Sequence, residues 1–178
     1  MRNIINKGIT EEHVFNAIEL AAAAGMKNIK LYYMLGLPGE ADSDIEEMIA
    51  MIGRVREKMD AALNKGDLII SVNGFIPKPF TPFQWSPLCD VKTLKRRFKM
   101  LETAFKKAKH IQVQTESLKE TVLQAVLARG DRRIGAALLE AFRREMPLKQ
   151  VLKEQGLDKN TIVIFASDHG ETMCSQRT

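Results

Sequence analysis

A strand–turn–helix–strand pattern within residues 28–85 constrains the fold of this 178-residue chain more than any other feature. An apolar run at 29–35 leads into the turn Gly36-Leu37-Pro38-Gly39-Glu40. Apolar residues then recur at helical spacing from Ile45 to Met59, and a second apolar run begins at Leu68. A long helix between two strands makes a crossover, so we expect parallel strands. The nearly continuous apolar run at 29–35 further predicts a strand covered on both faces.

Capping signals place the neighbouring helices. Thr10 predicts the start of a helix that ends near Gly25, and Ser43 with Glu46 predicts a capping box. Asp90 is the expected cap of the helix after the second strand. The remaining expected elements are a short strand at 110–115, helices at 118–128, 133–143 and 147–155, and a terminal strand at 161–166.

Two loops after the expected strands are candidates for ligand contact. Glycines in the 36–40 turn would let the backbone approach a ligand, but an ordinary structural turn fits the same residues. The loop at 76–87 holds four prolines and the aromatic residues Phe80, Phe83 and Trp85. Prolines make such a loop stiff and extended, so it serves either as a rigid cover or as a ligand contact.

Composition limits the classes of partner. The chain is 45% hydrophobic and 28% charged, as is usual for a soluble globular protein. Its net charge of +5 is not accompanied by aromatic residues within the basic stretches, so nucleic-acid binding is not expected. We expect no membrane partner and a cytoplasmic location, because no apolar run approaches the roughly 20 residues of a membrane span and the first residues lack a signal-peptide pattern. The two cysteines predict neither a disulfide framework nor a CxxC metal site.

Residues 1–143 resemble the C-terminal half of radical SAM enzymes, in the subgroup whose members often carry a cobalamin-binding domain. The stretches that carry the resemblance are Asn6-Lys7-Gly8-Ile9-Thr10-Glu11-Glu12, residues 30–40, residues 77–85 and Arg129-Gly130-Asp131-Arg132-Arg133. The resemblance implies an incomplete (β/α) barrel half, with 29–35 and 68–74 as its last two strands. It also implies S-adenosylmethionine as a cofactor, near Gly36, Gly39 and Glu40 and near Phe75, Ile76 and Pro77. The spacing from Gly36 to Glu40 is one residue longer than the family's pattern.

The chain departs from that family at the iron–sulfur centre. The family binds a [4Fe–4S] cluster through a CxxxCxxC motif, which this sequence lacks, and Cys89 and Cys174 cannot replace it. The glycine-rich and acidic segment that holds the amino-acid part of the cofactor is also missing. We therefore expect no radical catalysis by this chain alone, and we assign no catalytic residue.

A second resemblance covers the end of the chain. Residues 157–171 are similar to a segment of sulfatases and related enzymes of the alkaline phosphatase superfamily. That likeness implies that Asp168 and His169 ligate a divalent metal. The same pair also fits a hydrogen-bonded surface pair, and the nucleophile motif of those enzymes is absent. Either a fusion near residues 144–150 or chance similarity explains the two resemblances in one chain.

These observations divide the chain into a partial barrel (1–87), a helical extension (88–145) and a sulfatase-like tail (146–178). The resulting hypothesis is a fragment of a radical SAM enzyme. The alternatives are a fragment of a sulfatase-type hydrolase and a non-catalytic remnant. An unpaired edge of the half barrel further predicts self-association.

Overall fold

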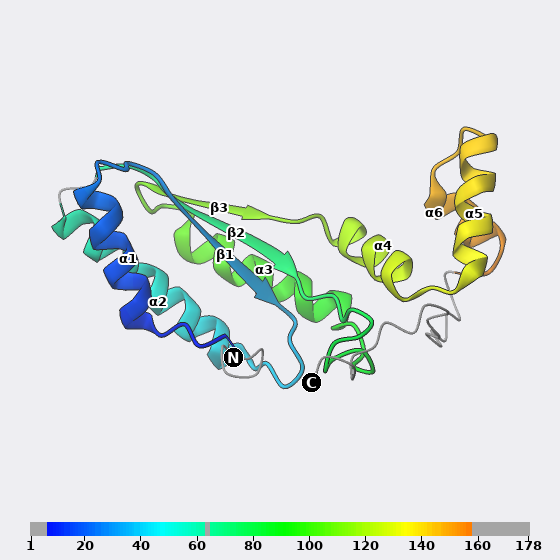
Figure 1. Cartoon of the computed structure of the whole chain (residues 1–178), viewed down its shortest axis with the longest axis horizontal. Coiled ribbons are helices and arrows are strands. Elements are labelled where there is room, and N and C mark those ends of the chain that lie inside the picture. The colour runs from blue at the N-terminus through cyan, green and yellow to red at the C-terminus, as the bar shows by residue number, and fades with distance from the viewer. Residues whose placement is uncertain (1–6, 63–64, 158–178) are drawn as a thin grey trace, which may run out of the picture. The chain divides into compact units, whose positions relative to one another are not determined.

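The computed structural model describes residues 7–62 and 65–157. The elements follow one another as α1 (Glu11–Ala23), β1 (Ile29–Leu35), α2 (Asp42–Ala61), β2 (Leu68–Gly74), α3 (Val91–Phe105), β3 (Ile111–Thr115), α4 (Leu118–Arg129), α5 (Arg132–Arg143) and α6 (Leu148–Glu154) (Figure 1). They form two compact units. Of the described residues, the first comprises 7–62, 65–75 and 86–121, and the second comprises 76–85 and 122–157.

The first unit is built on a three-stranded parallel sheet in the order β1-β2-β3. Leu31 of β1 pairs with Ile70 of β2, which pairs with Val113 of β3. Helices α2 and α3 make the two crossovers between these strands, which confirms the expected parallel arrangement. The fold is therefore mixed α/β, as the sequence predicted.

Helices α1, α2 and α3 share one core with one face of the sheet. Leu35, Leu68, Ile70 and Val72 point from the strands into this core and are fully buried. Ile45, Ile52, Val55 and Met59 from α2 and Leu94, Phe98 and Leu101 from α3 pack there, with Ile18 from α1. Burial of these apolar side chains supplies the main driving force for the unit.

Two of the predicted caps are confirmed and one is wrong. Thr10 Oγ1 accepts the His13 N–H at 3.2 Å, and Asp90 accepts the Thr93 N–H at 2.9 Å. Helix α2, in contrast, begins at Asp42. The Asp44 carboxylate accepts the Ala41 N–H at 2.8 Å, where a capping box of Ser43 and Glu46 was expected.

The second unit has its own small core, formed by Ile134, Ala137, Ala141, Val151 and Leu152. Asp131 caps α5 by accepting the Arg133 N–H at 2.9 Å and also forms an ion pair with the Arg133 side chain. The charged turn at 129–133 thus has a structural role in starting α5. No described helix has the length and apolar character that a membrane crossing requires.

The proline-rich segment of the second unit is folded on itself. Thr81 Oγ1 donates to the Lys78 carbonyl at 2.8 Å, and the Gln84 N–H donates to the Thr81 carbonyl at 3.0 Å. Arg129 Nη2 contacts the Gln84 carbonyl at 3.4 Å, which ties the segment to the end of α4. Trp85 remains 71% exposed.

Candidate functional site

One face of the parallel sheet is open and carries most of its polar side chains. Burial alternates along β1, and the Lys30 and Tyr32 side chains are exposed, Tyr32 at 73%. The prediction that both faces of this strand are covered is therefore wrong. Tyr32 and Met34 made the run look continuously apolar, although a tyrosine tolerates solvent because of its polar tip.

The open face forms rows across the three strands. Nearest the carboxyl ends, Met34 lies beside Asn73; the next row is Tyr32, Ser71 and Gln114, and the last is Lys30, Ile69 and Gln112. Asn73, Gln112 and Gln114 are exposed and Ser71 is half-buried. The Lys30 ammonium lies 5.2 Å from the centre of the Tyr32 ring. The face thus presents an aromatic ring, a hydroxyl group and amides, and Asn73 lies nearest the carboxyl ends, where ligands of α/β proteins bind.

The turn from Gly36 to Glu40 follows the carboxyl end of β1 and is held tightly. Gly36 has φ of +91°, and a Cβ placed there would lie 2.8 Å from Cys89 Cβ. The Gly36 N–H donates to Glu40 Oε2 at 2.7 Å, so the glutamate side chain closes the turn. Gly39 also has a positive φ, of +77°, but a Cβ there would meet nothing within 4 Å.

A buried ion pair fixes the end of this turn. Arg97 Nη1 donates to Glu40 Oε2 at 2.7 Å, and Arg97 Nη2 donates to the Glu40 carbonyl at 2.6 Å. The Glu40 side chain is 1% exposed and that of Arg97 8%. Arg97 Nε also reaches Asp42 Oδ1 at 3.3 Å. The carboxylate of Glu40 is thus used in holding the turn in shape.

Sequence reasoning missed this ion pair, because Glu40 and Arg97 are 57 residues apart. A signal was present in α3, where Arg97 falls on the apolar stripe formed by Leu94, Phe98 and Leu101. A charged side chain on a buried helix face needs a partner. That spacing predicts an acidic partner for Arg97 but does not identify Glu40.

Burial shifts the pKa values of two side chains at this turn, Glu40 and Cys89. Burial raises the pKa of the Glu40 carboxyl, while the Gly36 N–H and the nearby Arg97 act in the opposite direction. Burial likewise raises the pKa of the Cys89 thiol, which disfavours the thiolate, the nucleophilic form.

The structure brings together only some of the residues predicted to contact a cofactor. Gly36, Gly39 and Glu40 share one turn, and the Phe75 N–H donates to the Leu35 carbonyl at 2.7 Å beside it. Ile76 and Pro77 belong to the second unit, so their predicted role stays a prediction. Asp168 and His169, predicted metal ligands, lie outside the described residues.

Cysteine, histidine and acidic side chains are the possible ligands of a metal ion or cluster. The whole sequence holds two cysteines, fewer than the three that ligate the [4Fe–4S] cluster of the radical SAM family. Within residues 7–62 and 65–157, no group of three or more His, Cys, Asp or Glu side chains is arranged to hold a metal ion. These residues therefore do not fit an iron–sulfur cluster.

Comparison with known proteins gives one long and one short match. An uncharacterized protein of Methanocaldococcus jannaschii, MJ0966, is 34% identical over 175 residues, which cover 92% of this chain and 37% of that protein. An endo-4-O-sulfatase of Bacteroides thetaiotaomicron is 83% identical over 29 residues, which are 16% of this chain and 6% of the sulfatase. The chain thus spans well under half of either relative. No family model matches, and no solved structure matches.

Proposed function

We propose that this chain provides the adenosyl-binding half of a radical SAM protein. The observation that carries the proposal is the open, polar face of the sheet, on which Asn73 lies near the carboxyl end of β2 and the glycine turn follows the carboxyl end of β1. Ligands of open α/β sheets bind at the carboxyl ends of the strands. The motif resemblance over residues 1–143 selects S-adenosylmethionine among the possible ligands.

Named groups on this face suit a nucleoside. The amide of Asn73 can pair with the edge of an adenine, and the Ser71 hydroxyl can bond to a ribose oxygen. The Tyr32 ring, over which the Lys30 ammonium lies, offers an aromatic surface for stacking. Glu40 contributes indirectly, because its carboxylate is occupied by Arg97 and by the Gly36 N–H.

Catalysis lies outside this proposal. S-adenosylmethionine supplies a 5′-deoxyadenosyl group when an iron–sulfur cluster cleaves it, and the chain lacks the three cysteines for such a cluster. The residues of the open face bind and orient the cofactor, and no radical step is assigned to them.

Titration with S-adenosylmethionine tests the proposal. We expect heat of binding in isothermal titration calorimetry and a raised Tm, because a ligand that binds only the folded state stabilises it by about 2.7 kcal/mol at a hundred times its Kd. Asn73→Ala and Tyr32→Ala should each weaken binding by roughly tenfold, since each removes one contact worth about 1–1.5 kcal/mol.

Gln112→Ala is the matched control, because Gln112 lies on the same face at the opposite end of the strands. It should leave the affinity unchanged. A cooperative melt with neither binding heat nor a Tm shift, for S-adenosylmethionine and S-adenosylhomocysteine alike, would contradict the proposal.

A second candidate is divalent-metal binding by Asp168 and His169. The short match to an endo-4-O-sulfatase and the resemblance of residues 157–171 support it. Titration of the full chain with Mn²⁺ and with Zn²⁺ is the test. Asp168→Asn and His169→Gln should each abolish metal binding. If both variants bind the metal as tightly as the unsubstituted chain, this candidate is ruled out.

A further inference from the structure

The outer edge of β1 is available for another strand. In the described part of the chain, β1 pairs with β2 on one side and with no strand on the other. The Ile29 N–H donates to Asp67 and the Leu35 carbonyl accepts from Phe75, so alternate residues from Ile29 to Leu35 direct their backbone groups toward β2. Residues 30, 32 and 34 therefore direct their N–H and C=O groups outward.

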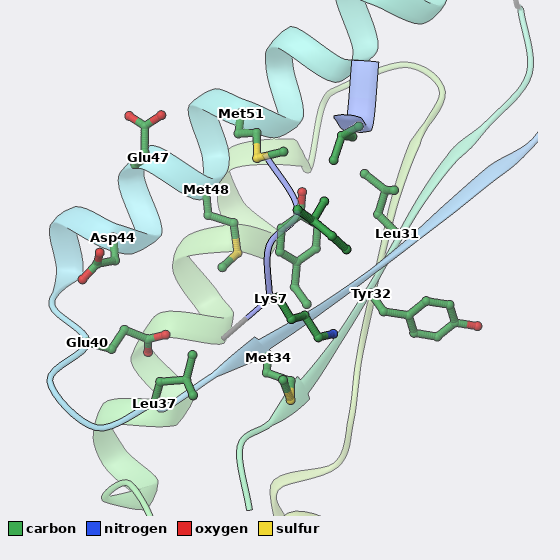
Figure 2. Close-up of a pocket in the computed structure, with 13 residues that line it drawn as sticks. Lys7, Leu31, Tyr32, Met34, Leu37, Glu40, Asp44, Glu47, Met48 and Met51 are labelled. Atoms are coloured by element: carbon green, nitrogen blue, oxygen red, sulfur yellow. The ribbon is translucent and has the colours of Figure 1, made fainter. Parts of the chain in front are cut away.

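An apolar cavity of about 340 Å³ runs along the same edge. Its walls include side chains from both faces of β1, together with Leu37, Met48 and Met51 (Figure 2). Because residues of both strand faces line it, the cavity lies at the strand edge and not over one face of the sheet. Strand addition uses this combination of an open backbone edge and an adjoining apolar pocket.

The acidic residues around the cavity are already engaged. Glu40 bonds to Arg97, Asp44 to the Ala41 N–H, and Glu47 to Arg54 at 2.8 Å. Figure 2 shows the carboxylates of Asp44 and Glu47 directed away from the methionines. Lys7 also lines the cavity, whereas most of the other lining side chains are apolar. This lining suits apolar side chains better than a small charged ligand.

We propose that a second copy of this chain docks its own β1 along this edge, antiparallel and related by a two-fold axis at Tyr32. Tyr32 then faces Tyr32 of the second copy and Lys30 faces Met34, each pair exchanging two hydrogen bonds. Leu31 and Tyr33 of each copy add apolar surface beside the cavity of the other.

Charge favours this orientation and this partner. The amino end of β1 carries Lys27 and Lys30, while its carboxyl end leads to Asp44. Glu40 does not count here, because Arg97 neutralises its buried carboxylate. Antiparallel pairing places the basic end of one copy beside the acidic end of the other and keeps the two Lys30 side chains apart. Like charges directly opposite would be unfavourable. The proposal does not depend on binding of S-adenosylmethionine.

Sedimentation of the full chain tests the association. We expect a monomer–dimer equilibrium at micromolar concentrations, and Tyr32→Pro should raise the dimer Kd at least tenfold. Proline at this position removes an outward N–H but none of the bonds to β2, and edge strands tolerate it there. Tyr32→Val keeps the N–H and should still dimerise. A wild-type chain that stays monomeric at high micromolar concentration would overturn the proposal.

Cross-linking tests the two-fold axis and does not depend on the folding of the proline variant. In a background of Cys89→Ser and Cys174→Ser, Tyr32→Cys should form a disulfide-linked dimer on mild oxidation, because its two Cα atoms would lie about 5.5 Å apart. Lys30→Cys should not, since its two copies lie at opposite ends of the interface. Equal cross-linking of both variants, or of neither, would exclude this axis.

Discussion

Replacement of Arg97 with methionine is expected to lower the free energy of unfolding by about 3–5 kcal/mol, the usual cost of removing one partner of a buried ion pair. Arg97 donates to the Glu40 carboxylate and to the Glu40 carbonyl at 2.7 and 2.6 Å. Both side chains are almost fully buried, so water cannot replace the lost contacts. Urea unfolding followed by far-UV circular dichroism measures the loss.

The pH dependence of the variant identifies the cause of this loss. Burial raises the pKa of Glu40 in the folded state above its value in the unfolded state. At a pH between these two values, the folded state therefore binds more protons than the unfolded state. The contribution of Glu40 to stability therefore falls as pH rises from about 4.5 through its folded pKa. Without Arg97 that folded pKa should rise further, because the attraction of the cation is lost.

The difference in stability between wild type and Arg97→Met should consequently be smaller at pH 5 than at pH 8. Adding Glu40→Gln to the variant should recover part of the loss at pH 8, since the amide carries no charge. A difference that is the same at both pH values would show that lost packing, and not an unpaired carboxylate, causes the destabilisation.

Arg96→Met is the matched control, one residue earlier on α3. Arg96 forms an ion pair with Asp42, but its side chain is 52% exposed and that of Asp42 40%. Exposed pairs of this kind contribute about 0–1 kcal/mol. If Arg96→Met lowers the free energy of unfolding as much as Arg97→Met does, the positive charge of α3 as a whole is responsible. The buried contact between Arg97 and Glu40 would then not explain the loss.

The local elements could be predicted because their signals lie within a few residues. Thr10 and Asp90 cap the helices that they were expected to cap, and the run at 29–35 forms β1 with the expected limits. The parallel direction of the strands followed from crossover length alone. These features depend on spacing and on backbone chemistry, both of which a sequence displays directly.

The features of the site depend on contacts that spacing does not display. Tyr32 counts as apolar in a periodic pattern, yet its exposure of 73% makes it part of the open face. Whether Glu40 lies near a cofactor stays a prediction, whereas its bonds to the Gly36 N–H and to Arg97 could not be foreseen from spacing. Both outcomes are decided by which helix covers the strand, and that information is tertiary.

The turn after β1 gives the second large effect. Gly36→Ala is expected to cost about 2–5 kcal/mol, the sum of two separate penalties. A non-glycine residue at positive φ costs roughly 1–2 kcal/mol, and overpacking against a neighbour costs about 1–3 kcal/mol. The second penalty arises because the new Cβ would lie 2.8 Å from Cys89 Cβ and 3.3 Å from Leu94 Cδ1.

Gly39→Ala separates the two penalties within the same turn. Gly39 has a similar positive φ, of +77°, but the methyl group of an alanine there would have no neighbour within 4 Å. Its substitution should therefore cost only the conformational part, about 1–2 kcal/mol. If both substitutions lower the free energy of unfolding equally, Cys89 can move away from the new methyl group without an energetic penalty. The close approach at Gly36 would then not affect stability.

A double-mutant cycle with Cys89→Gly assigns the steric part to one contact. Removing the Cys89 side chain should make Gly36→Ala less destabilising by about 1–3 kcal/mol, because the nearest atom to the new methyl group is gone. The conformational penalty should remain, since φ at Gly36 does not depend on Cys89. A coupling energy near zero would place the steric conflict at Leu94, the next neighbour, and Leu94→Ala would then show the coupling that Cys89→Gly lacks.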